Sequence, residues 1–138
     1  MKRQLKSIGI IKTPYNNLND CPSNISDNGP ICKIIVRKEY ETGLQGLNKN
    51  TKIIVLYWLD KCENTKLELQ VHSHADTENL RGVFSIRTPK RPNPIGVAIV
   101  NIIEIDENYI FVKGLDCLNG TALIDIKPAI YQELYETK

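Results

Sequence analysis

The chain has 138 residues, of which 41% are hydrophobic and 25% are charged, and its formal net charge is +2. These values are ordinary for one globular domain that buries its own core without disulfides or metal, and so small a charge does not by itself indicate a nucleic-acid binder. No apolar run approaches the ~20 residues of a membrane-spanning helix, and the basic N-terminus lacks the apolar stretch of a signal peptide. We therefore expect a single cytoplasmic domain over residues 1–138 that does not contact a membrane.

Strand signals dominate the first half of the chain. Residues 7–12 and 31–37 are short β-rich runs, and residues 52–59 form a nearly continuous apolar run, as in a strand covered on both faces. Residues 16–30 are rich in Asn, Asp, Ser, Pro and Gly and predict a long loop. A loop of this length in a compact domain is more often functional than idle. Residues 39–47 predict a turn or a short helix.

The middle of the chain is more irregular. Residues 67–71 alternate between apolar and polar side chains and predict a half-buried strand. Residues 72–81 are polar and predict a loop, whereas residues 82–87 predict another strand, which runs into a proline-rich segment.

The last third predicts a hairpin and one further strand. Residues 97–105 and 109–113 are rich in β-branched and aromatic side chains, and Asn108 is placed to form the turn between them. Residues 122–126 predict the last strand, and Pro128 is suited to the first turn of a short C-terminal helix or tail. About seven short strands with few short helices favour a mainly β fold, a compact β-barrel or sandwich.

The cysteines and histidines do not indicate a metal site. With no Cys-x-x-Cys pair, we expect four thiols that pack as small apolar groups; they are Cys21, Cys32, Cys62 and Cys117. His72 and His74 lie two residues apart, and a pair on one face of a strand can bind metal. Because no third ligand accompanies them, a surface loop is the favoured interpretation.

The most unusual stretch is the proline-rich segment from residue 87 to residue 96, with three prolines within six residues. Each proline fixes its own φ and biases the residue before it away from helix, which predicts a stiff, extended ribbon. The ribbon presents four polar side chains, those of Arg87, Lys90, Arg91 and Asn93. Preorganised cations suit a carboxylate or phosphate ligand, but a rigid connection with solvated charges explains the same pattern.

Four blocks in order along the chain resemble one known family. Residues 82–96 read G-V-F-S-I-R-T-P-K-R-P-N-P-I-G and resemble the pattern G-V-F-A-T-R-S-P-x-R-P-N-P-I-G. Residues 115–128 resemble L-D-x-x-D-G-T-P-L-x-D-I-K-P, residues 8–15 resemble I-G-x-I-x-S-P-Y/F, and residues 39–47 resemble E-Y-x-x-G-L-x-G-I. The chain thus resembles the TsaA-like (TrmO-type) proteins over nearly its whole length.

This resemblance implies a compact, non-Rossmann β-barrel that binds S-adenosylmethionine as a homodimer. The absence of any Gly-x-Gly-x-x-Gly after a strand fits this expectation. The resemblance also implies a methyltransferase that acts on tRNA, at N6 of a threonylcarbamoyladenosine next to the anticodon. Two alternatives stay open: a methyltransferase of the same fold with another acceptor, and a non-catalytic protein that binds S-adenosylmethionine or a nucleotide. We expect this chain to lack the C-terminal extension of the longer bacterial members, which leaves the acceptor open.

The resemblance also implies a set of site residues. The cofactor would contact the long loop, the end of the apolar strand, both ends of the ribbon and one late segment: Pro22, Ser23, Asn24, Asp60, Lys61, Arg87, Val97, Lys113, Gly114, Leu115 and Asp116. The candidate catalytic bases are Asp116 and Asp60. RNA would contact Lys90, Arg91, Asn93 and Lys127, and an unpaired base would stack on Tyr15, Tyr57 or Trp58. For Trp58, burial in the core is the favoured alternative.

Several positions depart from the family pattern. Ser23-Asn24 replaces Arg-Gln, Asp60-Lys61 replaces His-Gln, and His74 replaces an arginine. Ile86 and Ala122 replace a threonine and a proline. These departures leave the predicted fold unchanged but bear on the identity of the methyl acceptor.

Overall fold

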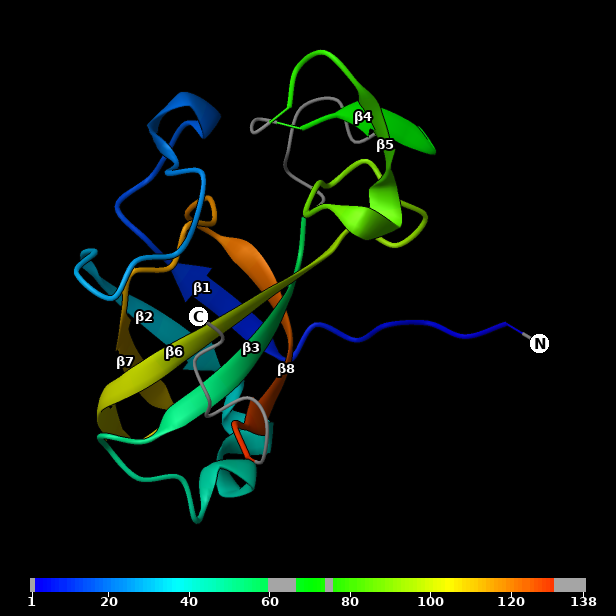
Figure 1. Ribbon diagram of the computed structural model, residues 1–138. Helices are drawn as coiled ribbons and strands as arrows, with labels where there is room; N and C mark the ends of the chain where they lie inside the picture. Colours follow the sequence, from blue (N-terminus) through cyan, green and yellow to red (C-terminus); the bar gives the residue numbers. More distant parts are fainter. Residues whose placement is uncertain (1, 60–66, 74–75, 131–138) are drawn as a thin grey trace.

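The computed structural model describes residues 2–59, 67–73 and 76–130, and its main body is a closed barrel (Figure 1). Neighbouring strands around the barrel are antiparallel. In order around the barrel they are β1 (Gly9–Lys12), β2 (Ile31–Val36), β7 (Tyr109–Lys113), β6 (Ile95–Asp106), β3 (Lys52–Trp58) and β8 (Thr121–Pro128), which returns to β1. The predicted mainly β barrel is therefore confirmed.

Alternation along each strand builds the core inside the barrel. In β3, Ile53, Val55 and Tyr57 point inward and are buried, while the residues between them stay half-buried. The prediction that this strand is covered on both faces was therefore wrong, because its outer face lies on the outside of the barrel. The buried side chains from the other strands include Ile11, Ile34, Ile102, Ile110 and Leu123.

The β6–β7 hairpin follows the prediction. Glu107 takes the left-handed conformation that a tight turn needs, with a φ of 54°, and Asn108 completes the turn. Asn108 is buried, and its Nδ2 donates a hydrogen bond of 2.7 Å to the carbonyl oxygen of Val36. The turn is thereby tied to the end of β2.

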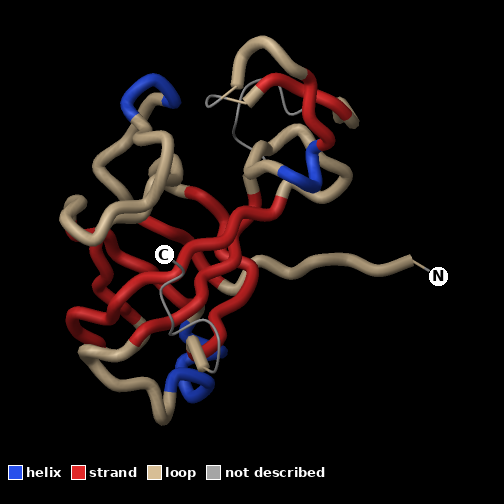
Figure 2. The backbone as a smooth tube through the Cα atoms, viewed as in Figure 1, coloured by secondary structure: helices blue, strands red, loops and turns tan. Residues whose placement is uncertain are grey.

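A small second sheet stands apart from the barrel (Figures 1 and 2). It pairs β4 (Gln70–His72) with β5 (Leu80–Gly82) and continues into the 3-10 helix η3 (Val83–Ser85). We call residues 67–73 and 76–86 the flap. The predicted ribbon is confined to residues 87–94, because β6 begins at Ile95, and the name is used for these residues from here on. Figure 2 shows the flap and the long loop as protrusions from the barrel strands.

The flap corrects three predictions. Of residues 82–87, only Gly82 lies in a strand, as the last residue of β5, because the amide of Val83 bonds the carbonyl of Leu69 at 3.0 Å and the chain then turns into η3. The Ser85 hydroxyl closes this turn on the carbonyl of Gly82 at 2.7 Å. The strand predicted at residues 67–71 lies instead at β4, with Leu69 exposed, and the loop predicted up to residue 81 contains most of β5.

The remaining connections that the structure describes contain only short 3-10 elements. The long loop contains one 3-10 turn, η1 (Leu18–Asp20), and the segment predicted as a turn or short helix forms η2 (Lys38–Leu44). Pro128 does not open a helix; it is the last residue of β8 and pairs with Ile53 of β3. The tail predicted beyond it falls mainly in residues 131–138, outside the described residues. Within the described ranges, no helix is both long enough and apolar enough to cross a bilayer.

Two of the cysteines behave as predicted. Cys32 and Cys117 are buried in the core, with 1% and 5% of their surface exposed. The thiol of Cys21 lies in the long loop and donates to the carbonyl oxygen of Asn17 at 3.7 Å. Cys62 and His74 lie outside the described residues. In the ranges that are described, no cluster of three or more His, Cys, Asp or Glu side chains could hold a metal ion.

Candidate functional site

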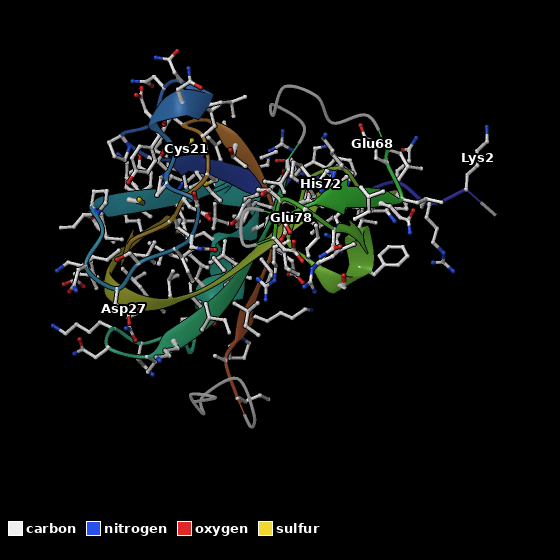
Figure 3. The ribbon with its side chains drawn as sticks, turned by 45° about the horizontal axis from the view of Figure 1, so that its top comes forward. Lys2, Cys21, Asp27, Glu68, His72 and Glu78 are labelled. Atoms are coloured by element: carbon white, nitrogen blue, oxygen red, sulfur yellow. The ribbon has the colours of Figure 1, made fainter. Side chains whose placement is uncertain are left out.

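A cavity of about 650 Å³ opens at the end of the barrel where the long loop and the flap project. Figure 1 shows η1 of the loop in blue and the flap in green at this same end, with η2 at the other. In Figure 3, Cys21 and Asp27 label the loop, and Glu68, His72 and Glu78 label the flap. The cavity is lined by residues 18, 21–25, 57–59, 84–89, 91, 95–99, 116–118 and 121. Loop, flap, ribbon and barrel all contribute to its wall.

A tyrosine and an aspartate from opposite parts of the sequence meet in this wall. The hydroxyl of Tyr57, at the end of β3, donates a hydrogen bond of 3.0 Å to Oδ1 of Asp116. Burial raises the pKa of the Tyr57 hydroxyl, so it stays protonated and acts as a donor. Burial also raises the pKa of the Asp116 carboxyl, while the bond from Tyr57 and the charge of Arg87 oppose this rise. The pair places one half-buried carboxylate at the cavity.

A glycine makes room for the tyrosine ring. Gly96, the last residue of the proline-rich motif, pairs with Tyr57 across β3 and β6. A Cβ at Gly96 would lie 2.8 Å from Cζ and 2.9 Å from Cδ2 of that ring, closer than real contacts allow. The ring therefore lies directly over the glycine, and this explains why the motif ends on the smallest residue.

The ribbon uses one of its cations to hold itself in place. Nη1 of Arg91 donates hydrogen bonds of 3.1 Å to the carbonyl oxygens of Ile86 and Thr88. The guanidinium also lies 6.0 Å from the centroid of the Phe84 ring, a cation–π distance. Arg91 thus fixes the path of the chain between the flap and the ribbon while it lines the cavity.

The other predicted RNA contacts are placed differently. Lys90 forms an ion pair of 3.5 Å with Glu68 of the flap, and Asn93 is exposed outside the cavity wall. Lys127, in β8, forms an ion pair of 2.8 Å with Asp125. Its neighbour across the strand pair is Ile54 of β3, so it lies away from the cavity end of the barrel. The structure does not bring these side chains together.

The predicted cofactor contacts divide into three groups. The wall of the cavity contains Pro22, Ser23, Asn24, Arg87, Val97 and Asp116. Three others lie behind it: Lys113 is exposed at the end of β7, Gly114 packs against the long loop, and Leu115 is fully buried in the core. Asp60 and Lys61 are outside the described residues.

Gly114 and Asn119 hold the long loop against the barrel. Gly114 has a φ of 82°, its carbonyl accepts from the Ser26 amide at 3.0 Å, and its own amide donates to Pro30 at 2.9 Å. A side chain at Gly114 would overlap the Ser26 carbonyl. The backbone amide of Asn119 donates to the carbonyl oxygen of Tyr15 at 2.7 Å, and its Oδ1 accepts from the amide of Thr13 at 3.1 Å. The loop wall is therefore fixed at both ends.

The aromatic and apolar part of the wall was predicted only in part. Trp58 was one of the stacking candidates, with core burial as the favoured alternative; it is half-buried and lines the cavity, because it follows the inward-facing Tyr57. Phe84 and Ile86 were not among the predicted site residues. Phe84 lines the cavity while 76% of its surface stays exposed. Ile86 joins them from the flap. The one sequence signal for Phe84 was its place in the matched block of residues 82–96, three residues before the proline-rich segment.

Comparison with known proteins matches residues 10–133 to the model of the tRNA-methyltransferase O N-terminal domain. An S-adenosyl-L-methionine-binding protein of Archaeoglobus fulgidus is 42% identical over 123 residues, which cover 89% of this chain and 86% of that protein. A second protein of that organism, named a probable S-adenosyl-L-methionine-binding protein, is also 42% identical, over 91% of this chain. The chain spans only 33% of the length of this second relative.

A solved structure has the same fold. The crystal structure of TrmO from Pseudomonas aeruginosa superposes with a TM-score of 0.75 at 20% sequence identity, covering 94% of this chain and 57% of the other. The barrel with its flap is thus a fold shared with part of a longer protein. The family match extends from β1 to just beyond β8 and includes every segment that lines the cavity. The chain therefore belongs to the family of the tRNA-methyltransferase O N-terminal domain.

Proposed function

We propose that this chain is a methyltransferase that binds S-adenosylmethionine in the cavity and methylates tRNA, at N6 of a threonylcarbamoyladenosine next to the anticodon. The observation that carries the proposal is the cavity wall, in which a cation, a half-buried carboxylate and aromatic surface line one space at the barrel end. Family membership and relatives named for S-adenosyl-L-methionine binding support it.

The residues of the wall fit the chemistry of this cofactor. A volume of about 650 Å³ lies within the range of small-molecule sites. Arg87 offers a guanidinium to the cofactor's carboxylate, and Asp116 offers its second oxygen to the ammonium or to ribose hydroxyls. Trp58 offers aromatic surface to the adenine or, through its ring quadrupole, to the sulfonium. Each functional group of the cofactor thus has a chemically matched partner.

When bound, the cofactor supplies an activated methyl group on a sulfonium, so the protein's task is alignment and exclusion of water. Tyr57 fixes the orientation of Asp116, and Gly96 fixes the position of Tyr57. Asp116 is the single carboxylate among the described lining residues. We propose that it also takes up the proton that the acceptor nitrogen loses, a role suited to a carboxyl whose pKa is raised by burial.

A second candidate function is binding without catalysis. The curated relatives described above are named only for S-adenosyl-L-methionine binding, and the chain spans 57% of the TrmO structure. A sensor or regulator would keep the cofactor pocket and would need no acceptor.

The resemblance also implies a homodimer, which sedimentation velocity on the purified chain would test.

The deciding experiment measures binding and transfer separately on the full chain. Calorimetry should give a saturable S-adenosylmethionine isotherm with one site per chain. Methyl-labelled cofactor should then label tRNA that carries threonylcarbamoyladenosine, and nucleoside mass spectrometry should locate the label on that base. Binding with no labelled tRNA would favour the non-catalytic function, and label on another nucleoside would change the acceptor. No cofactor binding at all would remove both proposals.

A further inference from the structure

The Phe84 side chain is the most exposed large hydrophobic group among the residues that the structure describes, with 76% of its surface accessible. It is also part of the cavity wall, at the tip of η3 where the flap meets the ribbon. An exposed aromatic ring loses the free energy that burial would give, and burial under a ligand recovers it. Its position at the rim of a cavity indicates a ligand that reaches in from solvent.

The ring is held before any ligand arrives. Its neighbour Val83 is buried, and the Val83 amide and the Ser85 hydroxyl fix η3 by the bonds to Leu69 and Gly82 described above. The Arg91 guanidinium lies over the ring at 6.0 Å and is itself fixed by two carbonyl oxygens. A preorganised aromatic surface loses little entropy when a planar group stacks on it.

We propose that Phe84, supported by Arg91, is the stacking platform for an unpaired nucleobase of the RNA acceptor. This inference rests on the proposed function and adds the part of the site that receives RNA. Arg91, a cation of the same cavity wall, lies over the ring at 6.0 Å. An aromatic face beside arginines is how proteins commonly bind single-stranded RNA, with bases on the rings and phosphates on the cations.

Two other occupants fit the geometry less well. The adenine of the cofactor would need a sheltered ring, and in this wall that ring is the half-buried Trp58 rather than the exposed Phe84. A second copy of the chain would bring identical groups of arginines toward each other, which costs free energy. An RNA loop instead brings negative charge to the cations and a base to the ring.

The test compares Phe84→Ala and Phe84→Trp with Leu80→Ala on the full chain. Leu80 is an exposed flap residue, 55% accessible, that does not line the cavity, so it controls for loss of apolar surface. Fluorescence anisotropy would measure affinity for a labelled anticodon stem-loop and for a fully paired RNA duplex. Calorimetry would measure affinity for S-adenosylmethionine, and sedimentation velocity would measure the oligomeric state.

Phe84→Ala should weaken binding of the stem-loop about 10-fold, the usual contribution of one stacked base, and should leave duplex and cofactor binding unchanged. Phe84→Trp should retain stem-loop affinity, and Leu80→Ala should match the parent.

Equal stem-loop affinity in the parent and in Phe84→Ala overturns the inference while the proposed function stands. A loss of cofactor affinity would assign the ring to the cofactor, and a change of oligomeric state would assign it to a second copy. A parent chain that binds cofactor but not the stem-loop also overturns it, whereas one that binds neither removes the proposed function itself.

Discussion

The Tyr57 hydroxyl and the Asp116 carboxylate, 59 residues apart in the sequence, are joined by a hydrogen bond of 3.0 Å at the cavity end of the barrel. Tyr57 is the last inward-facing residue of β3, and Asp116 lies in the connection between β7 and β8. The bond leaves Oδ2 of Asp116 for a ligand and fixes its direction. Three of the predictions below follow from this contact.

Tyr57→Phe should keep the ring and remove only the hydrogen bond. Because a bond to a charged group contributes about 1.5–3 kcal/mol, we expect S-adenosylmethionine affinity to fall roughly 10- to 100-fold. Calorimetry would measure this, with Tyr40→Phe as the control, because Tyr40 is an exposed tyrosine of η2 far from the cavity wall. Equal affinity in Tyr57→Phe and the parent would show that the bond does not position Asp116 for the ligand.

Gly96→Ala should displace the Tyr57 ring, since the added Cβ would lie 2.8 Å from Cζ. Overpacking of this kind typically lowers the free energy of unfolding by about 1–3 kcal/mol. Urea denaturation would measure the loss. Gly43→Ala is the matched control, because a Cβ there meets nothing within 4 Å, and it should leave the unfolding midpoint unchanged or slightly raised. Similar midpoints for the two variants would contradict the contact between Gly96 and Tyr57.

Arg87→Ala should remove the group that faces the carboxylate of the cofactor. We expect an affinity loss of about 10- to 100-fold, the effect of one charge-assisted bidentate contact. The decarboxylated form of S-adenosylmethionine should bind the parent chain with a similar loss, and Arg87→Ala should weaken it little further. Arg37→Ala serves as the control, since Arg37 forms an exposed ion pair with Glu39. Additive losses would mean that Arg87 contacts another part of the ligand.

The stability of the parent chain should carry a pH dependence from Asp116. Burial raises its pKa above the ordinary value of 3.8, so just above that value the folded chain holds a proton that the unfolded chain has released. The free energy of unfolding therefore falls as the pH rises through the folded-state pKa, and is lower at pH 7 than it would be with a neutral group.

Asp116→Asn should lose this contribution and be more stable than the parent at pH 7, while Oδ1 still accepts from Tyr57. Urea denaturation from pH 4 to pH 8 would measure the difference, with Asp106→Asn as the control at an exposed position of β6. The same variant should bind S-adenosylmethionine at least roughly 10-fold more weakly, because the charge is lost. An Asn variant less stable than the parent at pH 7 would contradict the burial of the charge.

The barrel could be predicted from the sequence because its strands carry local signals. Apolar residues at every second position mark the inner face of β3, and Asn108 marks the turn of the β6–β7 hairpin. The long loop was evident from its composition. The matched motifs pointed to the cavity wall at Arg87 and Asp116 before the structure was known.

The contacts that shape the site could not be predicted, because they depend on residues distant in sequence. Val83 and Phe84 have strand-forming side chains, yet a bond from the Val83 amide to Leu69 diverts them into η3. Arg91 looked like an exposed cation for RNA, but its guanidinium bonds two carbonyls of its own segment. Composition does not reveal whether a charged side chain is used internally or left for a ligand.

The anchoring of the long loop by Gly114 and Asn119 has a consequence for kinetics. Since both ends of the loop are bonded to barrel connections, this side of the cavity does not have to fold around an incoming molecule. Because association slows when binding requires a conformational change, a preformed wall should let it proceed without such a step. Differences in affinity between related ligands should therefore arise mainly from how long each one resides before it dissociates.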